Sequence, residues 1–318
     1  MTKDQHYIPK FYLKGFTDTD KTLWVCERFK PIRPSKPKNE AHRPDYYTHS
    51  ENGGRGEIAE DMLLRIESVA APIIRKIGNP QYQLTRQLAG NLYMFVAFMF
   101  ARVPSMREYS DQISSAVAKK THLEYARDKA RFHASCATFE SSSGKSLGID
   151  YEELRQHFLK GNYEFVQSSV AFNLGTMFDS AFHVLDQLMT FNYEILYAPP
   201  AHFFLTSDAP VMTVKPDGDG MGSVGVGFGW DGVEVIFPLN RRACLLLRRE
   251  EHMRSHVISE RALESINNLT MHCADRFVFS AEGHRRIARL FDERGSRVKP
   301  GVNAFMMSPN LPSNIGGK

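Results

Sequence analysis

The hydrophobic pattern changes its period once along this chain, and that change most constrains the fold. From about Gly56 to Phe191 apolar residues recur at helical spacing, whereas from Tyr193 onward short β-type runs dominate. Helices and strands segregated in this way are typical of an α+β fold. The sequence therefore predicts a helical middle section packed against a mainly antiparallel C-terminal sheet, which can also take in an N-terminal strand.

Individual elements follow from the same patterns. Helices are expected over 57–77, 84–103, 106 to about 132, 151–160, 163–191, 259–273 and 282–291. Strands are expected at 22–29, 193–198, 202–207, 211–214, 233–237, 243–247 and 276–280. The four prolines and the basic residues of 30–44 predict a loop. The chain thus reads as a single domain or two intimately packed halves, with sections at 1–55, 56–191 and 192–318.

Composition narrows the class of protein. With 318 residues, of which 42% are hydrophobic and 24% charged, the chain is long enough for a sizeable core. The four cysteines are far apart, so neither a zinc pair nor a secreted disulfide framework can be drawn. The first residues lack the apolar region of a signal peptide, and the apolar stretch 92–103 is shorter than the roughly 20 residues that a bilayer requires. We expect a protein of the cytoplasm with no membrane partner.

The start of the chain places a titratable group inside an aromatic segment. His6 is followed by Pro9, Phe11, Leu13 and Phe16, a density of large apolar side chains that an untethered N-terminus does not need. The segment is therefore expected to dock on the body of the protein and to hold His6 near a buried site.

Two carboxylates interrupt the amphipathic pattern of 57–77. A helical wheel places Ile58, Met62, Ile66, Val69, Ile73 and Ile77 on one apolar stripe. Glu60 and Glu67 are seven residues apart and lie on the border of that stripe, where a carboxylate either has a raised pKa or needs a cation. Arg102, at the end of the next helix, is a natural partner for either carboxylate or for an anionic ligand. An internal ion pair is the alternative to a functional site.

Ser207 and Asp208 follow the apolar run that ends at Leu205. Two oxygen-bearing side chains at the end of a strand are typical of a site. The alternative is a turn in which Asp208 caps its own backbone.

Three other features are read as structural. The glycine-rich stretch 218–232 matches no phosphate-binding motif and suggests a hairpin or lid. His252 and His256 have the spacing of a helical metal pair but lack the glutamate of a metalloprotease, so a surface pair is preferred. The basic loop at 30–43 can touch phosphates or be merely solvated.

Several short motifs together resemble a known family. They are His6-x-x-Pro9-x-Phe11-Tyr12-Leu13-x-x-Phe16, Tyr46-Tyr47, Glu60 with Glu67, Arg102-x-Pro104, Thr206-Ser207-Asp208-x-Pro210-Val211 and Phe237-Pro238-Leu239. On these residues the chain resembles the bacterial family known as domain of unknown function 4238, over nearly its whole length. The resemblance implies the extent of the domain and directs attention to these residues, but it implies no reaction.

Two classes of function fit the candidate residues. The first is a cytosolic hydrolase, either a metal-dependent nuclease or a phosphate-ester hydrolase, acting on a phosphate-containing or nucleic-acid substrate. In that interpretation Glu67 and Asp208 hold a divalent cation that activates water, His6 is the general acid or base, and Arg102 stabilises the developing anion. Glu60 and Ser207 are further catalytic candidates.

The second class is a non-catalytic binding or interaction protein in which the same groups form a structural polar network. A toxin or phage-defence effector is a third interpretation.

Overall fold

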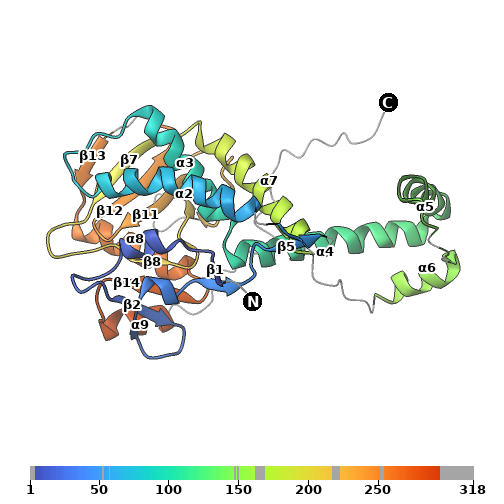
Figure 1. Cartoon of the computed structure of the whole chain (residues 1–318), viewed down its shortest axis with the longest axis horizontal. Helices are drawn as coiled ribbons and strands as arrows, with labels where there is room; N and C mark the ends of the chain where they lie inside the picture. The colour runs from blue at the N-terminus through green and yellow to red at the C-terminus, as the bar shows by residue number, and fades with distance from the viewer. Residues whose placement is uncertain are drawn as a thin grey trace. The chain divides into compact units, whose positions relative to one another are not determined.

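The computed structural model describes residues 4–51, 54–56, 58–146, 148, 150–161, 169–216, 223–250 and 254–293. Contacts between Cα atoms divide the chain into two compact units. One comprises Met1–Arg107 and Val170–Lys318, and the other comprises Glu108–Ser169. Each unit is described separately below, with the element labels of Figure 1.

The larger sheet of the first unit is built from late strands. Its order is β10-β9-β11-β12-β7-β13, and all neighbours pair antiparallel except β13, which runs parallel to β7. The strands are β7 (Asn192–Tyr197), β9 (Met212–Lys215), β10 (Ser223–Val224), β11 (Glu234–Asn240), β12 (Ala243–Arg248) and β13 (Arg254–Val257). Residues of β11 and β12 are buried almost throughout, so the centre of this sheet has core on both faces.

A second sheet joins the two ends of the sequence. Its order is β3-β2-β14-β8, all antiparallel. The strands are β2 (Leu23–Glu27), β3 (Arg33–Ser35), β8 (Thr206–Ser207) and β14 (Phe277–Ser280). The early strand expected at 22–29 therefore pairs with a C-terminal strand, Val25 lying opposite Phe279. Two short pairs complete the strands: β1 (Asp4–His6) with β4 (His42–Pro44), and β5 (His49–Glu51) with β6 (Gly54–Gly56).

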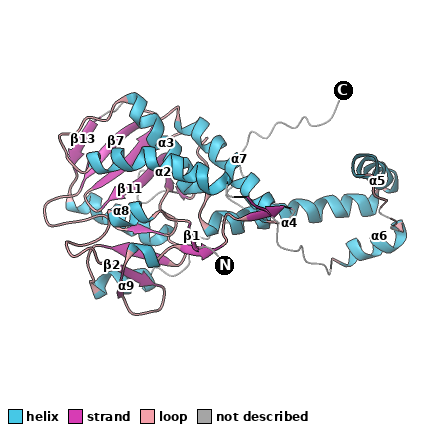
Figure 2. Cartoon of the chain, viewed as in Figure 1, coloured by secondary structure: helices cyan, strands magenta, loops and turns pink. Residues whose placement is uncertain are grey.

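Helices cover the larger sheet. Contacts link α3 (Arg86–Ala101) to both α2 (Ile58–Ile77) and α7 (Val170–Leu188), and Figure 2 shows these helices beside the strands β7 and β11. Two tyrosines of β7 tie the sheet to this layer, since Tyr193 donates to the Leu84 carbonyl and Tyr197 to the Ile77 carbonyl. Together with the two sheets, this layer confirms the α+β class.

Side chains cap the start of several of the remaining helices. In α8 (Glu260–Cys273) the Ser259 hydroxyl accepts from the Ala262 N–H, and α9 (Arg285–Glu293) follows β14. The second unit holds α5 (Lys129–Ser143), α6 (Tyr151–Lys160) and most of α4 (Pro104–Arg127). Within that unit the His122 ring stacks on Phe158, with centroids 4.2 Å apart.

The structure corrects the expected burial of α2. Ile58, Met62 and Val69, assigned to the core stripe, are 76%, 38% and 46% exposed. Ile73 and Ile77 of the expected stripe are buried, and Ala59, Leu63, Ala70 and Ile74 are buried with them. A helical wheel shows which face of a helix is apolar, whereas the neighbouring elements decide which of those residues are covered.

Four further expectations are corrected or fall outside the described residues. The single helix expected over 106–132 is two helices, α4 and α5, separated at Asp128, which caps α5. The loop at 30–44 contains β3, β4 and the 3-10 turn η1 (Pro37–Asn39). His256 lies on β13, so a helical histidine pair is wrong, and His252 lies outside the described residues. Residues 217–222 of the glycine-rich stretch also lie outside them.

No helix in the described part of the chain combines the length and the apolar character needed to cross a membrane.

Candidate functional site

The aromatic N-terminal segment docks on the first unit, as its composition predicts. The short helix α1 (Lys10–Lys14) begins after Pro9 and turns Tyr12 and Leu13 inward, where they are 1% and 0% exposed. Phe16 is fully buried, and the Phe11 ring lies 5.4 Å from that of Phe95 on α3. The large apolar area removed from water fixes the segment to the core.

Arg102 binds the N-terminal segment on one side through polar contacts. Its guanidinium is 2% exposed, with Nη1 2.8 Å from Glu67 Oε1 and Nη2 2.8 Å from the His6 carbonyl oxygen. Tyr47 donates to the same carbonyl, and its ring lies 5.9 Å from the guanidinium carbon. The ion pair considered for Arg102 therefore forms with Glu67, and it also anchors β1.

Glu60 faces a residue that sequence reasoning missed. The buried Gln5 side chain donates to Glu60 Oε2 at 3.1 Å and to Thr48 Oγ1 at 3.1 Å, while its own oxygen accepts from the Tyr47 N–H. A glutamine next to a conspicuous histidine carries no signal of its own in the sequence. Its partners show that Glu60 also serves the docking of β1.

The Thr206-Ser207-Asp208 segment organises neighbouring backbone. Thr206 Oγ1 lies 2.8 Å from the Tyr12 hydroxyl, which donates to the Pro238 carbonyl, and Ser207 Oγ accepts from the Ala209 N–H. The Asp208 carboxylate accepts from three successive N–H groups, those of residues 275, 276 and 277, at 2.9, 2.8 and 3.0 Å. Asp208 caps the chain between α8 and β14, not its own backbone.

Burial controls the proton affinity of Asp208. The side chain is 4% exposed, and desolvation raises its pKa to about 7, although the three N–H groups act in the opposite direction. Burial likewise raises the pKa of Tyr7, and the nearby Asp208 charge adds to that shift. Asp208 is therefore a buried acid beside the N-terminal segment.

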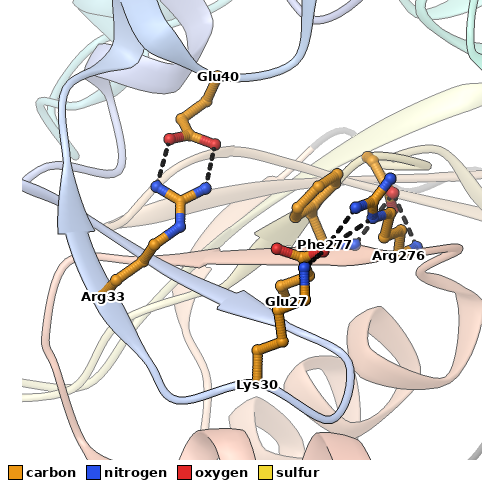
Figure 3. Close-up of polar contacts among 7 residues, drawn as sticks. Glu27, Lys30, Arg33, Glu40, Arg276 and Phe277 are labelled. Atoms are coloured by element: carbon orange, nitrogen blue, oxygen red, sulfur yellow. Dashed lines mark hydrogen bonds and ion pairs between the residues drawn. The ribbon is translucent and has the colours of Figure 1, made fainter.

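Charged side chains form ion pairs beside the smaller sheet (Figure 3). Glu27 accepts from Lys30 at 2.7 Å and from Arg276 at 2.6 Å, while Arg33 binds the two oxygens of Glu40 at 2.6 and 2.9 Å. These carboxylates are neutralised by partners within the same sheet region, so they are not free to hold a ligand.

Two histidines in this region each have a buried ring nitrogen without a hydrogen bond. His6 and His42 face each other across β1 and β4, with ring centroids 5.3 Å apart. The Nε2 atom of the His6 ring is buried without a hydrogen-bond partner. His42 Nδ1 is likewise without a hydrogen bond, although Asp4 Oδ1 lies 3.4 Å away. Sequence reasoning found His6 but not His42, because only the strand register brings them together.

The electrostatic surroundings favour the neutral form of His6. Desolvation lowers its pKa, and the charges of His42, Lys10 and Arg102 act in the same direction. A neutral imidazole with a free, unprotonated nitrogen is a competent general base near pH 7.

The predicted cation ligands are not free to share an ion. Glu67 is paired with Arg102, and Asp208 is engaged by three backbone N–H groups. Within the described ranges, no three His, Cys, Asp or Glu side chains group so that they could hold a metal ion. The two carboxylates, Glu67 and Asp208, therefore do not fit a common metal site.

A cavity of about 570 Å³ lies elsewhere, between residues 201–205 and the helices α8 and α9. Its lining includes Phe203, Leu263 and Ile287 but none of the six sequence candidates.

Comparison with known proteins identifies one family. The model of the family described as "Protein of unknown function (DUF4238)" matches residues 4–284. No curated protein and no solved structure matches the chain. The matched range spans every candidate residue discussed above.

Proposed function

The chain belongs to the DUF4238 family, whose description names no activity, and we propose that it hydrolyses phosphate-containing substrates. In this proposal His6 and His42 are the acid–base pair. The observation that carries the proposal is the pair of facing imidazoles, each with a buried nitrogen that lacks a hydrogen bond. Buried polar atoms without partners are rare in proteins and are often found where chemistry is done.

The proposed reaction needs one proton acceptor and one proton donor. Neutral His6 takes a proton from an attacking water at Nε2, the nitrogen that lacks a hydrogen bond. Protonated His42 gives a proton to the leaving oxygen as the phosphorus–oxygen bond breaks, so one P–O bond forms and one is lost. Rings 5.3 Å apart are close enough to reach two oxygens of one phosphoryl group.

Cations complete the proposed site. The positive charge of the Lys10 ammonium lowers the pKa of His6. The same charge would stabilise the negative charge that develops on the phosphoryl oxygens. Arg102 is a positioning residue in this scheme, since both ends of its guanidinium are occupied by Glu67 and the His6 carbonyl. The His42 side chain is 27% exposed and supplies the route to solvent.

A non-catalytic interaction protein is the second candidate. Its support is that Glu60, Glu67, Arg102, Ser207 and Asp208 all have partners within the chain. A network satisfied in this way stabilises the docked N-terminal segment without needing a ligand.

Variants of the two histidines separate these candidates. We expect His6→Gln and His42→Gln each to lower kcat/KM on a dinucleotide, whose alkoxide leaving group needs a proton, by about 10²- to 10⁴-fold while leaving the fold intact. His183→Gln, at an exposed histidine of α7, is the matched control. Activity should rise with pH through an apparent pKa below 6.5, because the surroundings lower the pKa of His6.

Two results would count against the hydrolase. One is the absence of turnover on phosphomonoesters, phosphodiesters and RNA, with and without added Mn²⁺. The other is turnover that survives both histidine substitutions. The Mn²⁺ arm, read by thermal shift as well as by rate, also tests the predicted cation directly.

A further inference from the structure

We propose that single-stranded nucleic acid is the polymer recognised at this site, bound through a strip of lysines beside the histidine pair. This inference rests on the proposed function, because the strip is assigned as the path of the strand toward His6 and His42. The strip is defined as Lys10, Lys14 and Lys38.

The fold gathers these three lysines on one surface. Lys10 and Lys14 are four residues apart on α1, so they lie on the same side of the helix, about 6 Å apart along its axis. Tyr12 and Leu13 turn inward, and both lysines are exposed. Lys38 is exposed on η1, which packs against α1. The strip adjoins the site along the chain, because Lys10 lies four residues after His6 and Lys38 lies four residues before His42.

The charge of the strip is not cancelled locally. None of the described carboxylates lies within ion-pair distance of Lys10, Lys14 or Lys38. Nearby acids have other partners: Glu40 binds Arg33, and Asp18 accepts from the Thr22 N–H. The first fifty residues hold ten lysines and arginines against six acids. Ammonium groups that have no neighbouring carboxylate can bind the phosphates of a nucleic acid.

The shape of the surface favours a single strand over a duplex. The lysines lie on a five-residue helix and a three-residue turn, neither of which is long enough to enter the groove of a duplex. A flexible strand can instead follow the lysines and bend one phosphate toward the partly exposed His42.

Salt dependence of binding tests the assignment. The probe is a fluorescein-labelled single-stranded RNA of mixed sequence, measured by anisotropy with His42→Gln protein so that it is not cleaved. Between about 50 and 200 mM NaCl, removing three phosphate contacts in Lys10→Gln/Lys14→Gln/Lys38→Gln should reduce the slope of log K against log salt by about 2. The control is Lys119→Gln/Lys120→Gln/Lys145→Gln, three exposed lysines of the second unit, whose slope should be unchanged.

The contrary results distinguish failure of the lysine strip from failure of the proposed hydrolase. An unchanged slope in the Lys10/Lys14/Lys38 variant overturns the strip, as does equal affinity for a duplex or for inorganic polyphosphate. Binding of RNA by a wild-type protein that turns over neither RNA nor small phosphate esters refutes the hydrolase but leaves the strip standing. Turnover of small esters without RNA binding refutes the strip alone.

Discussion

Replacing Arg102 with methionine tests how the N-terminal segment is held. The substitution keeps the apolar length of a buried side chain but removes the two donors that lie 2.8 Å from Glu67 and from the His6 carbonyl. Leaving one member of a buried ion pair alone costs about 3–5 kcal/mol. Glu67 is 17% exposed, so water recovers part of that cost, whereas the lost bond to the carbonyl adds about 1 kcal/mol. We expect the free energy of unfolding to fall by about 3 kcal/mol.

Urea unfolding followed by tryptophan fluorescence measures this loss. Both tryptophans, Trp24 and Trp230, lie in the unit that contains Arg102, so the signal reports the relevant part of the chain. Arg65→Met is the matched control on the exposed side of α2, and we expect it to change stability by less than about 0.5 kcal/mol.

A double-mutant cycle sharpens the test. With Glu67→Gln in the background, Arg102→Met no longer strands a charge, so the two losses should fall short of additivity by about 1–2 kcal/mol. A loss below about 1 kcal/mol for Arg102→Met, or simple additivity with Glu67→Gln, would refute the reasoning that this ion pair anchors β1.

Three further substitutions have defined expectations. Because the folded-state pKa of Asp208 is raised to about 7, wild-type stability should fall relative to Asp208→Asn as pH rises from 5 to 7, by about 2 kcal/mol in paired urea titrations. Wild-type stability that rises relative to Asp208→Asn over this range would contradict the assignment. Tyr12→Phe strands the Thr206 hydroxyl and a carbonyl, so urea unfolding should show a loss of about 1–2 kcal/mol; no loss would mean that water replaces the phenol. A Cβ on Gly283 would meet the Trp24 ring at 2.6 Å, so Gly283→Ala should cost about 1–3 kcal/mol and shift the tryptophan emission; an unchanged spectrum would contradict this packing.

The sequence predicted the secondary-structure elements better than the contacts between distant segments. The α+β class, the docked N-terminus and the pairing of Arg102 with one of two glutamates all follow from periodicity, aromatic density and the cost of burying charge. Each of these depends on residues near one another in the chain or on a general rule about charge.

Relations between distant segments could not be predicted in this way. The His6–His42 pair depends on the register of β1 against β4, and the role of Asp208 depends on backbone groups almost seventy residues later. Three side chains of the apolar stripe expected on α2 are exposed, and the buried face includes Ala59 and Ala70, which the stripe left out. A periodic pattern shows that a face is apolar, but only packing decides which face is covered.

The pairing of β2 with β14 has a consequence for synthesis of the chain. Leu23–Glu27 emerges early, yet the strand that covers its inner edge, Phe277–Ser280, is made about 250 residues later. At roughly 5–20 residues per second, that edge waits on the order of ten seconds or more without its neighbour. An open strand edge is a template for unwanted pairing, so we expect β2 to be prone to mispairing during synthesis until Phe277–Ser280 has emerged.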